Sequence, residues 1–263
     1  MRRLWYAAVA VLMFAPAAAH AQIFRGTNHC VACHQGLPER SQAGHSFQAW
    51  RQSPHAPGVT CDACHGGDPA ATDTARAHRT IIRSGDRRSP LFYSQIPQTC
   101  GRCHAAELGY FRASRHFARL QSDGRGPNCV TCHGAMATSV LTPEDVLSTC
   151  SACHAPGGAA PVDRARESAP ILSLVRAETM LYNVVSTVAA AAPKSQRSGA
   201  VAPLASAQRN LGAAAEVWHT FRLDSASARL SLARTDLAAA WTALGYHTPL
   251  DASLHAAPAA RHP

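Results

Sequence analysis

A short pattern, Cys-x-x-Cys-His, occurs five times in this 263-residue chain and uses all ten of its cysteines. The paired cysteines are Cys30 and Cys33, Cys61 and Cys64, Cys100 and Cys103, Cys129 and Cys132, and Cys150 and Cys153. This pattern is the attachment signature of c-type haem. Two thiols at this spacing reach the two vinyl groups of one porphyrin, and the next imidazole binds its iron. The sequence therefore predicts five haem c groups, with proximal ligands His34, His65, His104, His133 and His154.

Other uses of the cysteines explain the pattern less well. Paired Cys-x-x-Cys units can build a structural zinc site, but zinc does not require a histidine after every second cysteine. Disulfides would suit an exported protein, yet they also leave those histidines unexplained. A thioredoxin-like redox motif is expected once, near a βαβ pattern, and not five times.

The N-terminus has the features of a secretory signal peptide. Arg2 and Arg3 precede an apolar run over residues 4–19, and Ala19-His20-Ala21 provides a small-residue cleavage site. The alternative is an uncleaved membrane anchor, but the apolar run is short for a membrane span. We therefore expect cleavage after about Ala21 and a mature protein in the periplasm, where haem is attached to exported chains.

The composition of the cysteine-rich part favours a core built largely from cofactor. Only twenty of the 139 residues from 22 to 160 are Leu, Ile, Val or Phe, a proportion that would ordinarily indicate disorder. Haem rings supply the missing apolar surface. Their propionates also offset the formal net charge of +9, so the basic balance is no sign of nucleic-acid binding.

An internal repeat lies between the motifs. Trp50-Arg51-Gln52-Ser53-Pro54-His55 and Phe111-Arg112-Ala113-Ser114-Arg115-His116 share the form aromatic-Arg-x-Ser-x-His. Each stands between a plain motif and one followed by glycine, so the pattern indicates a duplicated structural unit. The fifth motif follows the second unit as an addition.

The histidines that remain are sufficient to supply a second ligand to every iron. Nine histidines remain after His20 and the five proximal residues are set aside. Two of them end the repeats, which marks them as distal ligands, and a histidine on the other face of the ring keeps the iron six-coordinate and low-spin. The proposed distal set is His45, His55, His78, His116 and His219. For each, the alternative is a surface or propionate-bonding histidine.

The C-terminal part changes to an Ala-, Leu- and Arg-rich composition with helical periodicity. Apolar residues recur at three- and four-residue spacing over 171–188, 204–221 and 230–244, with a phase slip near Asp224. Residues 193–203, bounded by two prolines, are expected to form a loop. We predict an antiparallel helical hairpin whose second arm is bent or broken near Asp224. His219 is then delivered to a haem, or is a satisfied histidine in an interface.

The predicted fold is mainly α. It consists of a signal peptide (1–21), a loop-rich pentahaem domain (22–160), a helical hairpin packed on it (161–248) and a flexible tail (249–263).

Residues 29–154 resemble the superfamily of periplasmic multihaem c-type cytochromes around the tetrahaem electron carrier of ammonia oxidisers. The resemblance rests on Trp50-x-x-Ser53-x-His55 and on the Cys-x-x-Cys-His-Gly sequences at Cys61 and Cys129. It implies closely packed haems with electron transfer along them. Members that reduce nitrite carry a Cys-x-x-Cys-Lys motif, which is absent here, and the tetrathionate and hydroxylamine enzymes carry eight haems.

The sequence and the resemblance together predict an electron-transfer protein. We expect it to relay electrons between a membrane quinol dehydrogenase, or another cytochrome, and a terminal acceptor such as a reductase. No catalytic residue is assigned, and a membrane-associated partner is compatible with the hairpin. The alternative function is reduction of small nitrogen or sulfur oxyanions at one open haem.

Overall fold

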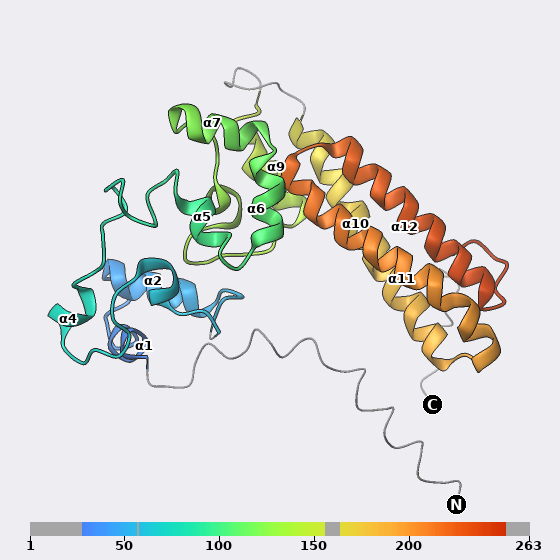
Figure 1. Cartoon of the computed structure of the whole chain (residues 1–263), viewed down its shortest axis with the longest axis horizontal. Helices are drawn as coiled ribbons and strands as arrows, with labels where there is room; N and C mark the ends of the chain where they lie inside the picture. Colours follow the sequence, from blue (N-terminus) through green and yellow to red (C-terminus); the bar gives the residue numbers. More distant parts are fainter. Residues whose placement is uncertain (1–27, 57, 156–163, 251–263) are drawn as a thin grey trace, which may run out of the picture. The chain divides into compact units, whose positions relative to one another are not determined.

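Short helices carry the cysteine motifs, and three long helices follow them (Figure 1). The computed structural model describes residues 28–56, 58–155 and 164–250. Every regular element in these ranges is a helix, which confirms the mainly α fold class. The predicted signal peptide and most of the predicted tail lie outside the described residues, as does the side chain of His45.

The contacts within the chain divide it into two units. The first contains residues 1–99 and 133–139, and the second contains residues 100–132 and 140–263. The domain limits expected from the sequence stay a prediction. The helices of the first unit are α1 (His29–His34), α2 (Gln42–Arg51), α3 (Cys61–His65) and α4 (Thr74–His78).

The second unit combines short helices with a bundle of long ones. Two further helices, α5 (Ile96–Cys100) and α8 (Cys129–His133), span the unit limits. The short helices inside the unit are α6 (Ala105–Arg112), α7 (Arg115–Asp123) and α9 (Pro143–Ser151). The bundle contains α10 (Arg164–Ala191), α11 (Lys194–Val217), the 3₁₀ helix η1 (Trp218–Thr220) and α12 (Leu223–Ala243).

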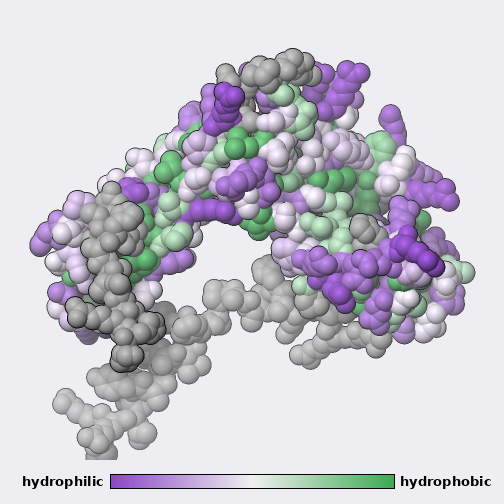
Figure 2. All heavy atoms as spheres, turned by 180° about the vertical axis from the view of Figure 1, so that it is seen from behind, coloured by the Kyte–Doolittle hydropathy of each residue, from purple (hydrophilic) through white to green (hydrophobic). Residues whose placement is uncertain are grey.

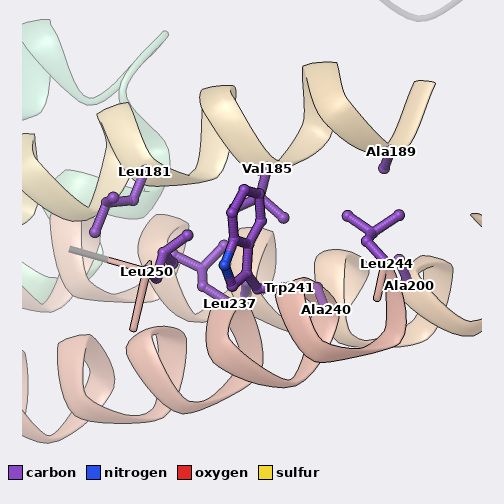
Figure 3. Close-up of a cluster of buried hydrophobic side chains, with 10 residues drawn as sticks. Leu181, Val185, Ala189, Ala200, Leu237, Ala240, Trp241, Leu244 and Leu250 are labelled. Carbon is purple, nitrogen blue, oxygen red and sulfur yellow. The ribbon is translucent and has the colours of Figure 1, made fainter. Parts of the chain in front are cut away.

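The bundle has an apolar core of its own side chains. Val185 from α10, Ala200 from α11 and Leu237 from α12 are fully buried, and Trp241 packs between these helices (Figure 3). A second cluster continues the core with Leu211, Ala214, Leu230 and Ala233. Because many core residues are alanines, the helix backbones can approach closely. This part of the chain therefore needs no cofactor to bury apolar surface.

The predicted hairpin is present, and its second arm is broken as expected. α10 and α11 form the hairpin, and the chain then turns at η1 so that α12 packs back along α11. Phe221 ends η1 with φ 57° and ψ 25°, the one non-glycine residue with positive φ in the described chain. The break thus lies between Trp218 and Arg222, just before Asp224.

The loop predicted for residues 193–203 is wrong. α11 begins at Lys194 and continues through Pro203. Proline in a helix removes one hydrogen bond and crowds the preceding turn, but burial of Ala200 and Ala207 on either side favours the helix. Gly199 also lets α12 approach closely, since a Cβ there would lie 3.3 Å from that of Ala243. Tertiary packing therefore overrides the local proline signal.

A buried polar network joins the first two motif helices within the first unit. The Asn28 side chain caps α1 by accepting a hydrogen bond from the Val31 amide at 3.1 Å. Its amide group donates to Thr60 Oγ1 at 3.1 Å and to Asp62 Oδ1 at 3.0 Å. Thr60 is the N-cap residue of α3, so one asparagine fixes the starts of both helices.

Among the described residues, no helix is long and apolar enough to span a membrane.

Candidate haem-binding sites

The five motifs occur in two kinds of local structure. The first, second and fourth form short helices of their own, α1, α3 and α8, whereas the third and fifth begin in the last residues of α5 and α9. The glycine after the second and fourth motifs has a structural reason. Gly66 and Gly134 adopt φ values of 73° and 81°, which glycine alone adopts readily. These residues turn the chain immediately after the predicted proximal histidine.

The Cys30 thiol of the first motif lies close enough to the Cys61 thiol of the second to affect its pKa. No disulfide joins any of the ten cysteines. Burial, then the nearby Asp62, raise the pKa of the Cys30 thiol. Burial, then proximity to Cys30, raise the pKa of Cys61. The attachment points of the first two predicted haems therefore lie close together in one unit.

The third, fourth and fifth motifs also contribute neighbouring thiols, all within the second unit. A hydrogen bond between Cys100 and Cys129 raises the pKa of Cys100 and lowers that of Cys129. Burial, then proximity to Cys150 and Cys153, raise the pKa of Cys132 to about 11. The fourth motif thus adjoins both the third and the fifth. Such adjacency is what a series of closely spaced haems requires.

Two predicted proximal histidines each face a histidine from the predicted distal set. The ring centroids of His34 and His78 are 6.1 Å apart, and those of His116 and His154 are 6.0 Å apart. A metal–imidazole bond of about 2.0 Å and a nitrogen-to-centroid distance of about 1.1 Å place two imidazoles on one metal ion about 6.2 Å apart. Both pairs match this separation, so the residues present fit a haem iron between them.

The ring nitrogens of several histidines are arranged as in metal ligands. Nδ1 of His78 lies 2.8 Å from the Thr74 carbonyl oxygen, and Nδ1 of His133 lies 3.0 Å from that of Ser139. Nδ1 of His219 lies 3.3 Å from the Glu216 carbonyl oxygen. A ligating histidine commonly donates its other ring N–H to such an acceptor. In such an arrangement Nε2 would be the atom that binds an iron.

His116 differs from these three residues. Its buried Nδ1 has no hydrogen-bond partner in the described structure. Burial, then the nearby His154, lower the pKa of its imidazole. His34 has a lowered pKa for the same reasons, burial and proximity to His78. Both rings are therefore held towards the neutral form, the form that binds a metal.

The two repeats share a local backbone structure. The Ser53 amide donates to the Trp50 carbonyl and the Ser114 amide donates to the Phe111 carbonyl, each at 2.9 Å. All four of these side chains are buried. The copies then diverge, because the hydroxyl of Ser53 accepts from the His55 amide whereas Ser114 caps α7 and accepts from Phe117. These shared contacts support a duplicated unit.

The remaining distal candidates occupy separate elements. His55 lies in the turn after α2, His219 lies in η1, and the backbone of His45 lies in α2. η1 packs against α6, the helix that begins directly after His104. Partial burial, then the nearby His34, lower the pKa of the His65 imidazole.

One residue of the fifth site was not identifiable from the sequence. The Phe221 ring lies 4.2 Å from the His116 ring, centroid to centroid, at an interplanar angle of 80°. Sequence reasoning placed Phe221 in a helical seam, where aromatic residues usually contribute to a core. Its position just before a phase slip was the only available signal.

Apolar side chains remain exposed around the motifs as well as on the bundle. Figure 2 shows hydrophobic and hydrophilic residues interspersed over the visible face. The exposed large apolar residues of the motif-bearing segments are Leu37, Ile81, Tyr93, Val140 and Leu147. Singly exposed apolar residues of this kind are common on protein surfaces.

One comparison with known proteins finds a match. Residues 14–66 match the model of the family described as cytochrome c554 and c-prime. The matched segment contains the first two motifs and the first repeat. It supports a c-type cytochrome with haem c as cofactor and electron transfer as its general role. No curated protein matches the chain, and no solved structure matches it either.

Proposed function

We propose that this chain is a periplasmic pentahaem cytochrome that relays electrons between redox proteins. The observation that carries the proposal is the pairing of His34 with His78 and of His116 with His154 at the separation expected across an iron. An iron with histidine on both faces has no open position. Such a centre suits electron transfer, because little rearranges when it is reduced.

Each motif would hold one haem by two thioether bonds and one imidazole. Bound haem supplies the redox-active iron and, in its rings, much of the apolar core. The chain's own residues do the rest. Asn28 and Thr60 fix the first two attachment helices, and the Nδ1 hydrogen bonds of His78 and His133 orient those imidazoles. In this assignment His45, His55 and His219 serve the remaining irons.

The closeness of the motifs within each unit supports a relay. Cys30 and Cys61 are neighbours in one unit, and Cys132 adjoins Cys150 and Cys153 in the other. We propose a membrane quinol dehydrogenase or another cytochrome as donor and a terminal reductase as acceptor. The apolar run at residues 4–19 and the small residues after it support export to the periplasm.

The first test is the number and spin state of the haems in the purified protein. Intact mass should exceed that of the processed chain by five haem groups, and electron paramagnetic resonance of the oxidised protein should show only low-spin iron. A mass corresponding to fewer haems would contradict the pentahaem assignment. A high-spin haem would contradict a function limited to electron transfer. The reduction of nitrite, hydroxylamine and tetrathionate would then be assayed.

Replacing the cysteine pair of one motif tests whether that motif attaches a haem. The double variant Cys150→Ala/Cys153→Ala should lose one haem mass and keep the other four. Retention of all five would contradict attachment at the fifth motif. The first cysteine pair, replaced in the same way, is the matched control for a motif inside the family match.

A further inference from the structure

Phe221 has a backbone conformation that bulky residues rarely adopt. Its φ of 57° lies in the left-handed region, where the Cβ atom crowds the following carbonyl oxygen. Such a residue persists only when its surroundings determine its position, and it is often found at functional sites. In the described chain, all other residues with positive φ are glycines. The conformation therefore raises the question of what holds Phe221 there.

The Phe221 side chain packs edge-to-face against two rings. It meets His116 at 4.2 Å and 80°, and Phe111 at 6.4 Å and 70°. Phe111 in turn packs on Phe117 at 5.6 Å and 78°. The left-handed turn directs this ring out of the bundle's second arm and onto the histidine. All of these residues, together with His154, belong to one unit.

Hydrogen bonding does not fix the His116 ring. The Nδ1 atoms of His78, His133 and His219 lie within hydrogen-bond distance of backbone carbonyl oxygens, whereas the buried Nδ1 of His116 has no partner. Aromatic packing against Phe221 is a contact that can restrain rotation of this ring about its bond to Cβ. Edge-to-face geometry is directional, so it can select one orientation.

We propose that Phe221 is a positioning residue for the fifth haem, holding the His116 imidazole opposite His154 by packing. The inference rests on the proposed ligation of this iron by His116. It gives the helical bundle a role in the haem site, since Phe221 lies at the break between α11 and α12. The His116 and His154 rings, inclined at 67°, keep that relative orientation only while Phe221 is in place.

The test compares electron paramagnetic resonance spectra of four oxidised full-length variants. His116→Ala identifies the signal of the fifth haem, because that low-spin signal should be lost and replaced by a high-spin one. Phe221→Leu should shift or broaden the same signal, with part of it becoming high-spin. Phe221→Tyr keeps an aromatic ring, so its spectrum should match that of the unaltered protein. Leucine and tyrosine carry the same backbone strain, so strain cannot explain a difference between them.

A matched control separates positioning from general stability. Tyr246→Leu removes another aromatic contact of the same unit, the stacking of Tyr246 on Trp241 at 4.0 Å, and should leave all haem signals unchanged. An unaltered spectrum in Phe221→Leu would overturn the positioning role while leaving the ligation intact. A low-spin fifth haem in His116→Ala would overturn the ligation itself. A spectral change in Tyr246→Leu equal to that in Phe221→Leu would reduce Phe221 to a structural residue.

Discussion

His34 and His78 face each other across 6.1 Å, although one belongs to the first cysteine motif and the other ends α4 after the second. Nothing in the sequence between them indicates the pairing. Their rings are inclined at 35°, and His78 is oriented by its contact with the Thr74 carbonyl. The iron of the first haem would lie between them.

His78→Ala is expected to convert the first haem from low-spin to high-spin. The variant removes one axial ligand and leaves Cys30, Cys33 and His34 intact, so the haem should stay attached. The optical and electron paramagnetic resonance spectra report the spin state, and intact mass reports the attachment. Replacement of His247, an exposed residue near the C-terminus, is the control and should change neither. A wholly low-spin His78→Ala variant would exclude this pairing.

The fifth haem is expected to have a higher reduction potential than the first. A hydrogen bond from Nδ1 makes an imidazole a better donor and stabilises ferric iron, and His78 has such a contact whereas His116 does not. A redox titration followed by electron paramagnetic resonance can compare the signals that His78→Ala and His116→Ala remove. The opposite order of potentials would contradict this reasoning.

Asn28→Ala is expected to destabilise the first unit by about 2 kcal/mol. It removes a helix cap and the side-chain amide that donates to the buried Thr60 hydroxyl, while Asp62 keeps its hydrogen bond from Thr60 Oγ1 at 2.7 Å. Asn28→Asp keeps the capping oxygen but loses the donor and places a carboxylate beside Asp62, so it should be at least as harmful. Ser41→Ala removes only the more exposed cap of α2 and should cost less. Denaturant unfolding of the three holo-proteins measures the difference.

Gly66→Ala is expected to destabilise the protein by about 1–3 kcal/mol. Its φ of 73° and ψ of −154° lie in a region that is essentially restricted to glycine. Gly109, inside α6, has open space where a Cβ would go, so Gly109→Ala should be neutral or stabilising by about 0.5–1 kcal/mol. Thermal unfolding of the two variants provides the comparison. Equal effects would show that the turn after the second motif tolerates a side chain.

Arg234→Leu is expected to destabilise the helical bundle, by up to about 3 kcal/mol. Arg234 Nε lies 2.7 Å from Oε1 of Glu178, a buried carboxylate whose Oε2 already lacks a partner. The loss leaves a buried charge uncompensated. The double variant Glu178→Leu/Arg234→Leu should recover much of the stability, as measured by denaturant unfolding. A double variant less stable than Arg234→Leu would contradict the charge argument.

Local chemistry explains what the sequence could predict. Haem attachment needs five residues in a row, and helices leave a periodic pattern, so the motifs, the mainly α class and a break near Asp224 were accessible. Pairings were not accessible, because His34 with His78 and His116 with His154 are contacts made by folding. The helix through Pro203 was missed for a similar reason, since burial of Ala200 and Ala207 outweighs the local cost of proline.

Duplicating a segment copies a side chain but not its surroundings. The serine in each repeat makes the same 2.9 Å bond to its aromatic neighbour, yet His116 faces His154, and the first repeat is followed by no residue equivalent to His154. His55 therefore cannot have inherited the same partner. A shared sequence signature therefore does not fix which imidazole a histidine meets, because the neighbour of His116 comes from a motif that has no counterpart after the first repeat.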